Sequence, residues 1–215
     1  MAEGQLPAGL DQAIPSIRRW SQAALPQPLS ESDLARLLTC GPDGTGIGTR
    51  NYAVLMLLAR LGLRAKEGAR LHLTDIDWAT GSLLIRSSQT HPERRLPLAQ
   101  DVGDALRAYL RTARPLSAVR DILLEHTAPY PPLPAAAAIT RIVQRLLSKA
   151  GIVRQSSGAH LFRHTAATQR VNRGGSFKAG ADIWGHPQLL TTGSYATLDL
   201  STLAEVTLPW PGGVQ

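Results

Sequence analysis

The sequence predicts a mainly helical domain that also contains one small three-stranded antiparallel sheet, an α+β fold. Apolar residues recur at the spacing of an amphipathic helix in several separate segments of the chain. Between two of these segments, residues 71–98 instead contain short runs of alternating apolar and polar residues, separated by turn residues. Hydrophobic residues make up 43% of the 215, so the chain can bury a packed core.

Capping residues and an apolar run predict the first two helices. Ser30, with Asp33 three residues later, has the spacing of a helix N-terminus and predicts a short helix over 31–39. We expect Thr49 to cap the next helix, which is strongly apolar. Gly62 should end it, because glycine readily adopts the left-handed conformation that closes a helix.

The three strands are predicted by period-two alternation. The first spans 71–78 and is followed by a turn at Thr80-Gly81. The second and third strands are expected at 82–86 and 94–98, and residues 87–93 connect them. Such short strands with tight turns favour an antiparallel sheet.

Irregular, proline-rich sequence separates the later helices. A helix begins near Asp101, and residues 112–136 follow with one weak strand expected at 122–124. Four further helical segments are expected at 139–147, 160–173, just before Gly185, and 201–206. Residues 1–29 contain four prolines and are interpreted as an arm or linker remnant, and 208–215 as a tail.

The charge balance points to a polyanionic partner. Lys+Arg total 23 against 16 Asp+Glu, which gives a formal charge of +7 and a pI near 10.3. Arginine supplies most of this charge, since lysine occurs only at positions 66, 149 and 178. The planar guanidinium group can bind two phosphate oxygens at once, which an ammonium group cannot do.

Two other features exclude whole classes of protein. Cys40 is the single cysteine, so a disulfide framework and the usual multi-cysteine zinc site are both excluded. No apolar run approaches the roughly 20 residues of a membrane helix, and the N-terminus lacks a secretory signal pattern. We therefore expect a soluble, cytoplasmic protein with no membrane partner.

Side chains suited to phosphodiester chemistry are concentrated near the C-terminus. His160, Arg163, His186 and Tyr195 lie within a short span, and Arg64 lies far upstream. The Tyr195 phenol has an ordinary pKa of about 10, so it needs a base or nearby positive charge to attack phosphorus. Two arginines could stabilise the charge of a pentavalent transition state.

Each of these residues has an ordinary structural explanation when it is taken alone. Arg163 could form a salt bridge, and Tyr195 could belong to a core. A metal site is a further alternative, because His160 and His164 are spaced four apart on a predicted helix. Asp182 is the one nearby candidate for a third ligand.

Six separated blocks occur in one order along the chain. They are Ala59-Arg60-Leu61-Gly62-Leu63-Arg64-Ala65-Lys66-Glu67, Leu73-Thr74-Asp75-Ile76-Asp77-Trp78, Arg95-Leu96-Pro97-Leu98, Gly158-Ala159-His160-Leu161-Phe162-Arg163-His164-Thr165, Trp184-Gly185-His186-Pro187 and Thr191-Thr192-Gly193-Ser194-Tyr195-Ala196. With these blocks, residues 30–207 resemble the catalytic domain of the tyrosine recombinases, also called phage integrases. The resemblance implies the integrase-like catalytic fold.

The resemblance also implies how the upstream and downstream cations act. Arg64 and Arg163 are similar to the two arginines that clamp the phosphate. Glu67 is similar to the carboxylate that braces the site. Arg86 and Arg94 are additional candidates for DNA binding in this chain.

The remaining roles implied by the resemblance concern proton transfer and bond formation. His160 resembles the first histidine of the family, His186 the second, which donates to a phosphate oxygen, and Tyr195 the nucleophile. The implied activity is site-specific recombination, with DNA integration by a mobile element among its forms, through a 3′-phosphotyrosyl intermediate. The family uses no metal and no small-molecule cofactor, and acts on duplex DNA as a homo-oligomer.

One departure from the family concerns the proton donor. The family places a lysine between the second and third strands, where it protonates the leaving 5′ oxygen. Here Ser88 lies near that position, and no lysine occurs between residues 66 and 149. His91, Arg86 and Arg94 are candidates for its replacement, and loss of such an acid typically costs ~10²–10⁴-fold in rate.

The second departure concerns the N-terminus. Family members usually carry a helical domain that grips the other face of the DNA, whereas about 30 residues precede the resemblance here. Two alternatives to an active recombinase follow. One is a catalytically impaired DNA-binding relic, and the other is a type IB topoisomerase-like enzyme with the same chemistry.

Overall fold

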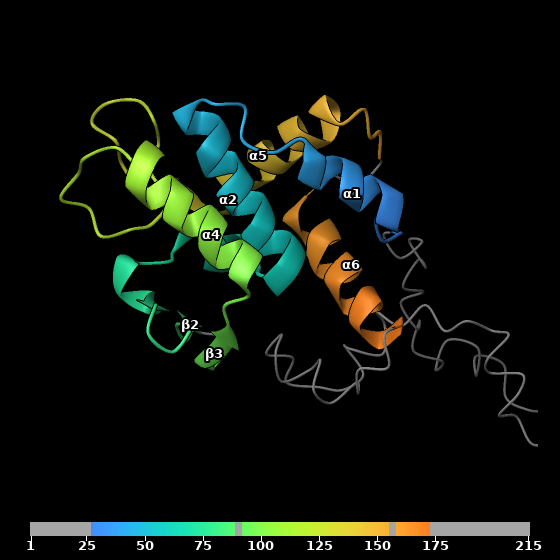
Figure 1. Cartoon of the computed structure of the whole chain (residues 1–215), viewed down its shortest axis with the longest axis horizontal. Coiled ribbons are helices and arrows are strands. Elements are labelled where there is room, and N and C mark those ends of the chain that lie inside the picture. The colour runs from blue at the N-terminus through green and yellow to red at the C-terminus, as the bar shows by residue number, and fades with distance from the viewer. Residues whose placement is uncertain (1–26, 89–91, 155–157, 173–215) are drawn as a thin grey trace, which may run out of the picture.

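The computed structural model describes residues 27–88, 92–154 and 158–172, and Figure 1 shows how these segments are arranged. The helices are α1 (Glu31–Thr39), α2 (Gly46–Leu61), α3 (Ala65–Ala69), the 3₁₀ turn η2 (Leu73–Asp75), α4 (Gln100–Ala108), the π-helical turn η3 (Tyr109–Ala113), α5 (Ala135–Lys149) and α6 (Ala159–Asn172). The strands are β1 (Ile76–Asp77), β2 (Ser82–Ile85) and β3 (Arg94–Pro97). This mainly helical fold with a small antiparallel sheet confirms the predicted class.

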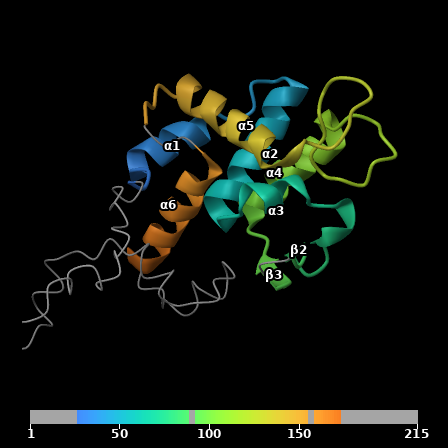
Figure 2. The same ribbon diagram turned by 180° about the vertical axis from the view of Figure 1, so that it is seen from behind.

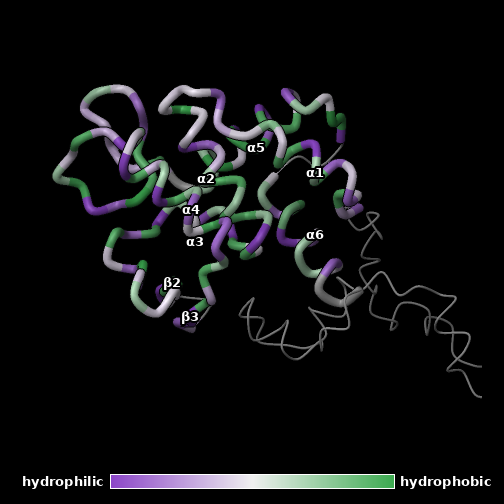
Figure 3. Tube along the Cα trace, viewed as in Figure 1, coloured by the Kyte–Doolittle hydropathy of each residue, from purple (hydrophilic) through white to green (hydrophobic). Residues whose placement is uncertain are grey.

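Helix α2 is the centre of the described fold. It packs against α4, α5 and α6, and Figures 1 and 2 show these helices surrounding it, with the sheet at one end. Residues 53–59 are all buried, as expected for a helix that is apolar on every side. Each such leucine contributes roughly 1.5–3 kcal/mol by burial. In Figure 3 hydrophobic and hydrophilic residues alternate along the helices around α2.

The predicted start of α2 was wrong by one turn, whereas its predicted end is confirmed. Thr45, not Thr49, is the N-cap, and its hydroxyl accepts a hydrogen bond of 2.9 Å from the amide of Gly48. A side chain at Gly48 would displace the Asp43 carboxylate, because a Cβ would lie 1.8 Å from one of its oxygens. Two glycines in the first turn conceal the helix start from pattern analysis. Gly62 ends the helix with φ 62°.

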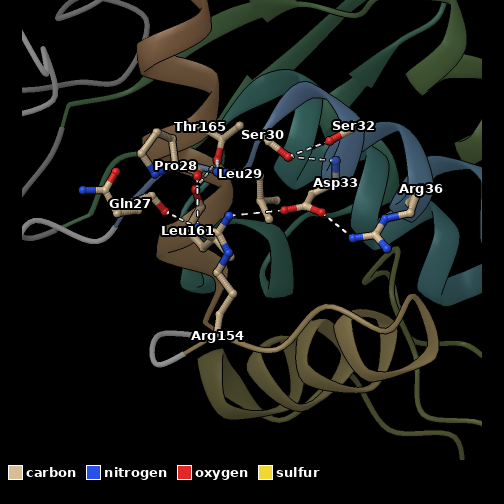
Figure 4. A network of polar contacts seen from close by, with 10 residues as sticks. All are labelled: Gln27, Pro28, Leu29, Ser30, Ser32, Asp33, Arg36, Arg154, Leu161 and Thr165. Carbon is tan, nitrogen blue, oxygen red and sulfur yellow. Dashed lines mark hydrogen bonds and ion pairs between the residues drawn. The ribbon is translucent and has the colours of Figure 1, made fainter.

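Helix α1 begins as predicted and is tied to the far end of the chain's described part. The Ser30 hydroxyl accepts from the amide of Asp33, which confirms the predicted cap. Figure 4 shows that Arg154 donates to the backbone carbonyls of Gln27 and Pro28, at 2.8 and 3.0 Å. The amide of Leu29 also donates to the Thr165 hydroxyl of α6, at 2.9 Å. The segment that leads into α1 is thereby fixed against α6.

The sheet has the order β1-β2-β3, with both pairs antiparallel. The predicted first strand over 71–78 was largely wrong, because η2 occupies its middle and β1 has two residues. The Asp75 carboxylate accepts from the amide of His72 at 2.8 Å and closes the 3₁₀ turn. Such side-chain bonds to the backbone compete with a strand ladder. The second and third strands are confirmed within one residue at their C-terminal ends.

In the segment between α4 and α5, hydrogen bonds from the Arg114 side chain to backbone carbonyls take the place of a strand. The predicted strand at 122–124 was wrong, since the described residues of this segment form only isolated bridges, His72 with Asp121 and Leu124 with Pro132. The Arg114 guanidinium donates to the carbonyls of residues 119, 121 and 122 at 2.6–3.3 Å.

No helix within the described part of the chain is long and apolar enough to cross a membrane.

Candidate active site

The end of α2 positions Arg64. Gly62 turns the chain out of the helix, and the fully buried side chain of Leu63 anchors it. Arg64 is therefore the N-cap of α3, at a fixed place beside the core. Its backbone amide donates to Glu67 Oε2 at 2.8 Å, and its Nη1 donates to Glu67 Oε1 at 3.0 Å.

The Glu67 carboxylate is shared by two arginines. Besides Arg64, it accepts a hydrogen bond of 2.9 Å from Nη2 of Arg94, at the start of β3. Burial favours the neutral form of the carboxyl group. The amide of Arg64 and the charges of Arg94 and Arg64 outweigh that effect, so the pKa of Glu67 lies below its ordinary value. Glu67 is thus an anion that braces two cations.

Arg163 reaches the same region from α6. Its residue is 2% exposed, and its Nη1 donates to the carbonyl oxygen of Gly62 at 2.9 Å. That carbonyl belongs to the turn immediately before Arg64. The bond therefore fixes α6 against the end of α2, and it holds the two arginines on neighbouring walls of one cavity.

This cavity has a volume of about 250 Å³ and contains three of the residues predicted for the site, Arg64, His160 and Arg163. Gly158 and Ala159, at the N-terminus of α6, also line it, as does Thr140 of α5. Backbone amides at a helix N-terminus attract anions. Two guanidinium groups, an imidazole and this helix end together form a site suited to a phosphate group.

The His160 ring is held in its neutral form. Partial burial lowers its pKa first, and the positive charges of His164, Arg163 and Arg64 lower it further. A neutral imidazole can accept a proton, which is what a phenol nucleophile requires. His160 remains exposed to solvent, so a substrate can reach it.

A second, larger cavity of about 930 Å³ shares Arg64 with the first, and Glu67 also lines it. It extends along α3 and the sheet, past Arg86 and Ser88. Arg86 is bound to the buried Asp75, with 2.7 Å between Nε and Oδ1. Three more basic residues line this cavity, namely Lys66, Arg70 and His72. Its wall therefore carries more basic than acidic side chains.

Several predicted residues fall outside the described part of the chain. His91, His186, Tyr195 and the alternative metal ligand Asp182 all belong to this group. Both histidines of the metal alternative are described, and of these His164 is 1% exposed, with its Nδ1 3.3 Å from the Thr168 hydroxyl. No cluster of three potential metal ligands occurs within residues 27–88, 92–154 and 158–172.

Two features of the site have no signal in the local sequence. They are the bond from Arg94 to Glu67 and the place of Thr140 of α5 in the lining of the first cavity. Arg94 is 27 residues from Glu67, so no local spacing could reveal their ion pair. Thr140 is an unremarkable helical residue in the sequence. The glycine before α6, Gly158, was the one available signal, because a side chain there would narrow the approach to the helix N-terminus.

Acidification within the histidine range should destabilise the fold. Burial lowers the pKa of His164. Burial and the charge of Arg50 lower the pKa of His126. The pKa of His160 is lowered as well. The unfolded chain, with histidine near 6.5, therefore binds more protons between the folded and unfolded pKa values. We expect the urea midpoint to be lower at pH 5.5 than at pH 7.5. An equal or higher midpoint at pH 5.5 would contradict these shifts.

Comparison with known proteins identifies the family. The sequence model of the "Phage integrase family" matches residues 27–201. A putative integrase/recombinase, y4rA, of Sinorhizobium fredii is 38% identical over 212 residues, which cover 99% of this chain and 51% of the relative. The chain thus spans about half the length of that relative.

Two solved structures have the same fold. The XerA recombinase superposes with a TM-score of 0.70 and 28% identity, covering 92% of this chain and 68% of its own. The XerH site-specific recombinase, bound to a palindromic difH substrate in a post-cleavage complex, gives a TM-score of 0.70 at 23% identity. That alignment covers 86% of this chain and 54% of XerH. With the family match extending over most of its length, this chain belongs to the phage integrase family.

Proposed function

We propose that this chain cleaves and rejoins duplex DNA during site-specific recombination, with residues 30–207 as its catalytic domain. The observation that carries the proposal is the cavity shared by Arg64, His160 and Arg163. A phosphodiester is an anion, and negative charge builds up on its non-bridging oxygens in the transition state. Two fixed guanidinium groups stabilise that charge. The XerH structure with its DNA substrate supports duplex DNA as the ligand.

Cleavage is a displacement at phosphorus in which Tyr195 replaces the 5′ oxygen. The phenol oxygen of Tyr195 forms a bond to phosphorus, and its proton passes to neutral His160. The bond from phosphorus to the 5′ oxygen breaks, and that oxygen takes up a proton, for which Ser88 and His91 are the candidate donors. The products are a 3′-phosphotyrosyl link and a free 5′ hydroxyl. Because the link conserves the energy of the original bond, the reverse reaction rejoins the strand without ATP.

The proposed partners follow from this chemistry. Duplex DNA occupies the cationic cavities beside Arg64, and His186 donates to a phosphate oxygen. Protomers pair on DNA as a homo-oligomer, since recombination exchanges two duplexes. The proposed reaction requires neither a metal nor a small-molecule cofactor, and it needs no membrane.

A covalent-trapping assay tests the function. A duplex selected by the chain from a random pool is nicked just beyond the cleavage site, so that the released fragment is lost and religation fails. The 5′-labelled strand should migrate with the denatured protein, while a 3′ label should be released. Binding should weaken steeply with salt, because phosphate contacts release counterions. Salt-sensitive binding with no covalent species would instead establish the alternative, a DNA-binding relic.

That second candidate is favoured by the absence of a lysine between residues 66 and 149, and it leads to a prediction. Ser88 lines the cavity that contains Arg64 and Glu67, so Ser88→Lys should place an acid near the leaving oxygen. We expect cleavage to rise by ~10²–10⁴-fold, the usual contribution of a general acid.

Two controls keep this result interpretable. Ser87→Lys adds the same charge at the neighbouring position, which lines the same cavity. A substrate with sulfur in place of the leaving 5′ oxygen needs no proton, so Ser88→Lys should leave its cleavage rate unchanged. An unaltered rate on the oxygen substrate would show that another group already supplies the proton.

A further inference from the structure

Arg94 and Arg95 are adjacent arginines of β3 with opposite environments. The Arg94 side chain is 9% exposed and its Nη2 binds Glu67 at 2.9 Å. Arg95 is exposed, with Nη1 3.5 Å from the Ser82 hydroxyl. Neighbouring strand residues point to opposite faces of a sheet, so the chain offers a matched pair.

Glu67 connects Arg94 to Arg64, which lines the cavity of about 250 Å³ together with His160 and Arg163. The carboxylate receives Arg64 on both oxygens, through the backbone amide and the guanidinium, and Arg94 on Oε2. A single negative charge shared between two cations leaves net positive charge at Arg64. If Glu67 faced Arg64 alone, the pair would be nearly neutral and would stabilise less of the negative charge that builds up in the transition state.

Arg94 also holds one end of the β2–β3 connection. Arg86 holds the other end, through its 2.7 Å ion pair with Asp75. Both carboxylates belong to the segment between α2 and the sheet that begins at Arg64. The two ion pairs therefore fix both ends of the connection against the segment that carries Arg64.

We propose that Arg94 is a positioning residue for DNA cleavage, acting through Glu67 on the orientation and charge of Arg64. This inference rests on the proposed function. The charge of Arg94 is paired with Glu67 inside the protein. Removal of Arg94 should therefore change the chemical step and leave DNA affinity intact. Arg64 remains the group that contacts the phosphate.

The test compares Arg94→Met with Arg95→Met, which removes the same charge from the exposed face. At saturating DNA, Arg94→Met should slow covalent adduct formation by roughly 10–100-fold, the range expected when a reacting group is displaced by about 1 Å. Its dissociation constant for DNA should stay within about twofold of the unmutated value. Arg95→Met should leave the adduct rate unchanged. Arg94→Lys restores the charge but not the planar fork of the guanidinium group, so it should recover part of the rate.

Three readouts separate positioning from a merely structural role. Urea unfolding confirms that the variants are folded under assay conditions. In an Arg64→Ala background, Arg94→Met should add little further loss, because its effect passes through Arg64. On a substrate with a neutral methylphosphonate at the cleaved position, the Arg94→Met defect should shrink, because no phosphate charge needs Arg64.

Other outcomes would overturn the inference. Weaker DNA binding with an unchanged adduct rate would make Arg94 a DNA contact, and full additivity with Arg64→Ala would remove the link to Arg64. If the unmutated chain forms no adduct, the proposed function fails, and the inference is judged by NMR alone. The ¹⁵Nε resonance of Arg64 should shift in Arg94→Met and not in Arg95→Met, and an unshifted resonance would refute the positioning role.

Discussion

Tyr195→Phe is expected to abolish the covalent protein–DNA adduct while leaving DNA affinity within about twofold, because the phenyl ring keeps its size and lacks the attacking oxygen. Denaturing electrophoresis of the nicked duplex with a 5′ label measures the adduct. Tyr52→Phe on α2, which packs partly buried against the core, is the matched control and should retain it. An adduct that persists in Tyr195→Phe would show that another side chain is the nucleophile.

Arg163→Ala is expected to lower cleavage at saturating DNA by at least about 10³-fold. Removal of one preorganised transition-state donor typically costs ~10²–10³-fold, and a phosphate-binding arginine costs up to ~10⁵-fold. Arg163 lines the cavity that it shares with Arg64 and His160, where its guanidinium is fixed by the Gly62 carbonyl. Single-turnover adduct formation is the measurement.

The structure changes one expectation about this variant. From the sequence alone, Arg163→Ala should largely spare stability, because its role is transition-state charge. Arg163 is instead 2% exposed, and its loss leaves the Gly62 carbonyl without that donor, which costs roughly 1–3 kcal/mol. The assay therefore runs well below the unfolding temperature of the variant.

Arg154→Ala is a matched control for the stability effect. Arg154 also donates to backbone carbonyls, those of Gln27 and Pro28, but it does not line the phosphate cavity. It should also lose stability, by less than Arg163→Ala because its bonds are exposed or part-buried, and it should retain the rate of adduct formation. An equal loss of rate in both variants would mean that the Arg163→Ala defect reflects folding rather than chemistry.

Local chemistry explains which parts of the fold were predictable. Ser30 and Gly62 act on their immediate neighbours, so a cap and a helix end can be recognised from a few residues. Residues 71–78 alternate like a strand, yet the Asp75 carboxylate bonds to the amide of His72 and forms a turn. Period-two patterning cannot register that competing bond.

Three residues of the candidate site could be named from the sequence, whereas the contacts that connect them could not. Arg64, His160 and Arg163 were named from chemistry and family resemblance, and they share a cavity in the structure. The sharing of Glu67 between Arg64 and Arg94 depends on how α3 meets β3. The bond from Arg163 to Gly62 spans 101 residues, and depends on how α6 docks on α2. Such contacts are set by tertiary packing, which local patterns do not encode.

A structure of the Tyr195→Phe variant bound to its selected duplex would examine most directly whether Arg64, His160 and Arg163 surround a single phosphate. We predict that the phosphate at the cleavage site accepts hydrogen bonds from both guanidinium groups, with the residue 195 ring facing phosphorus. A duplex seated elsewhere, with this cavity empty of phosphate, would contradict the account.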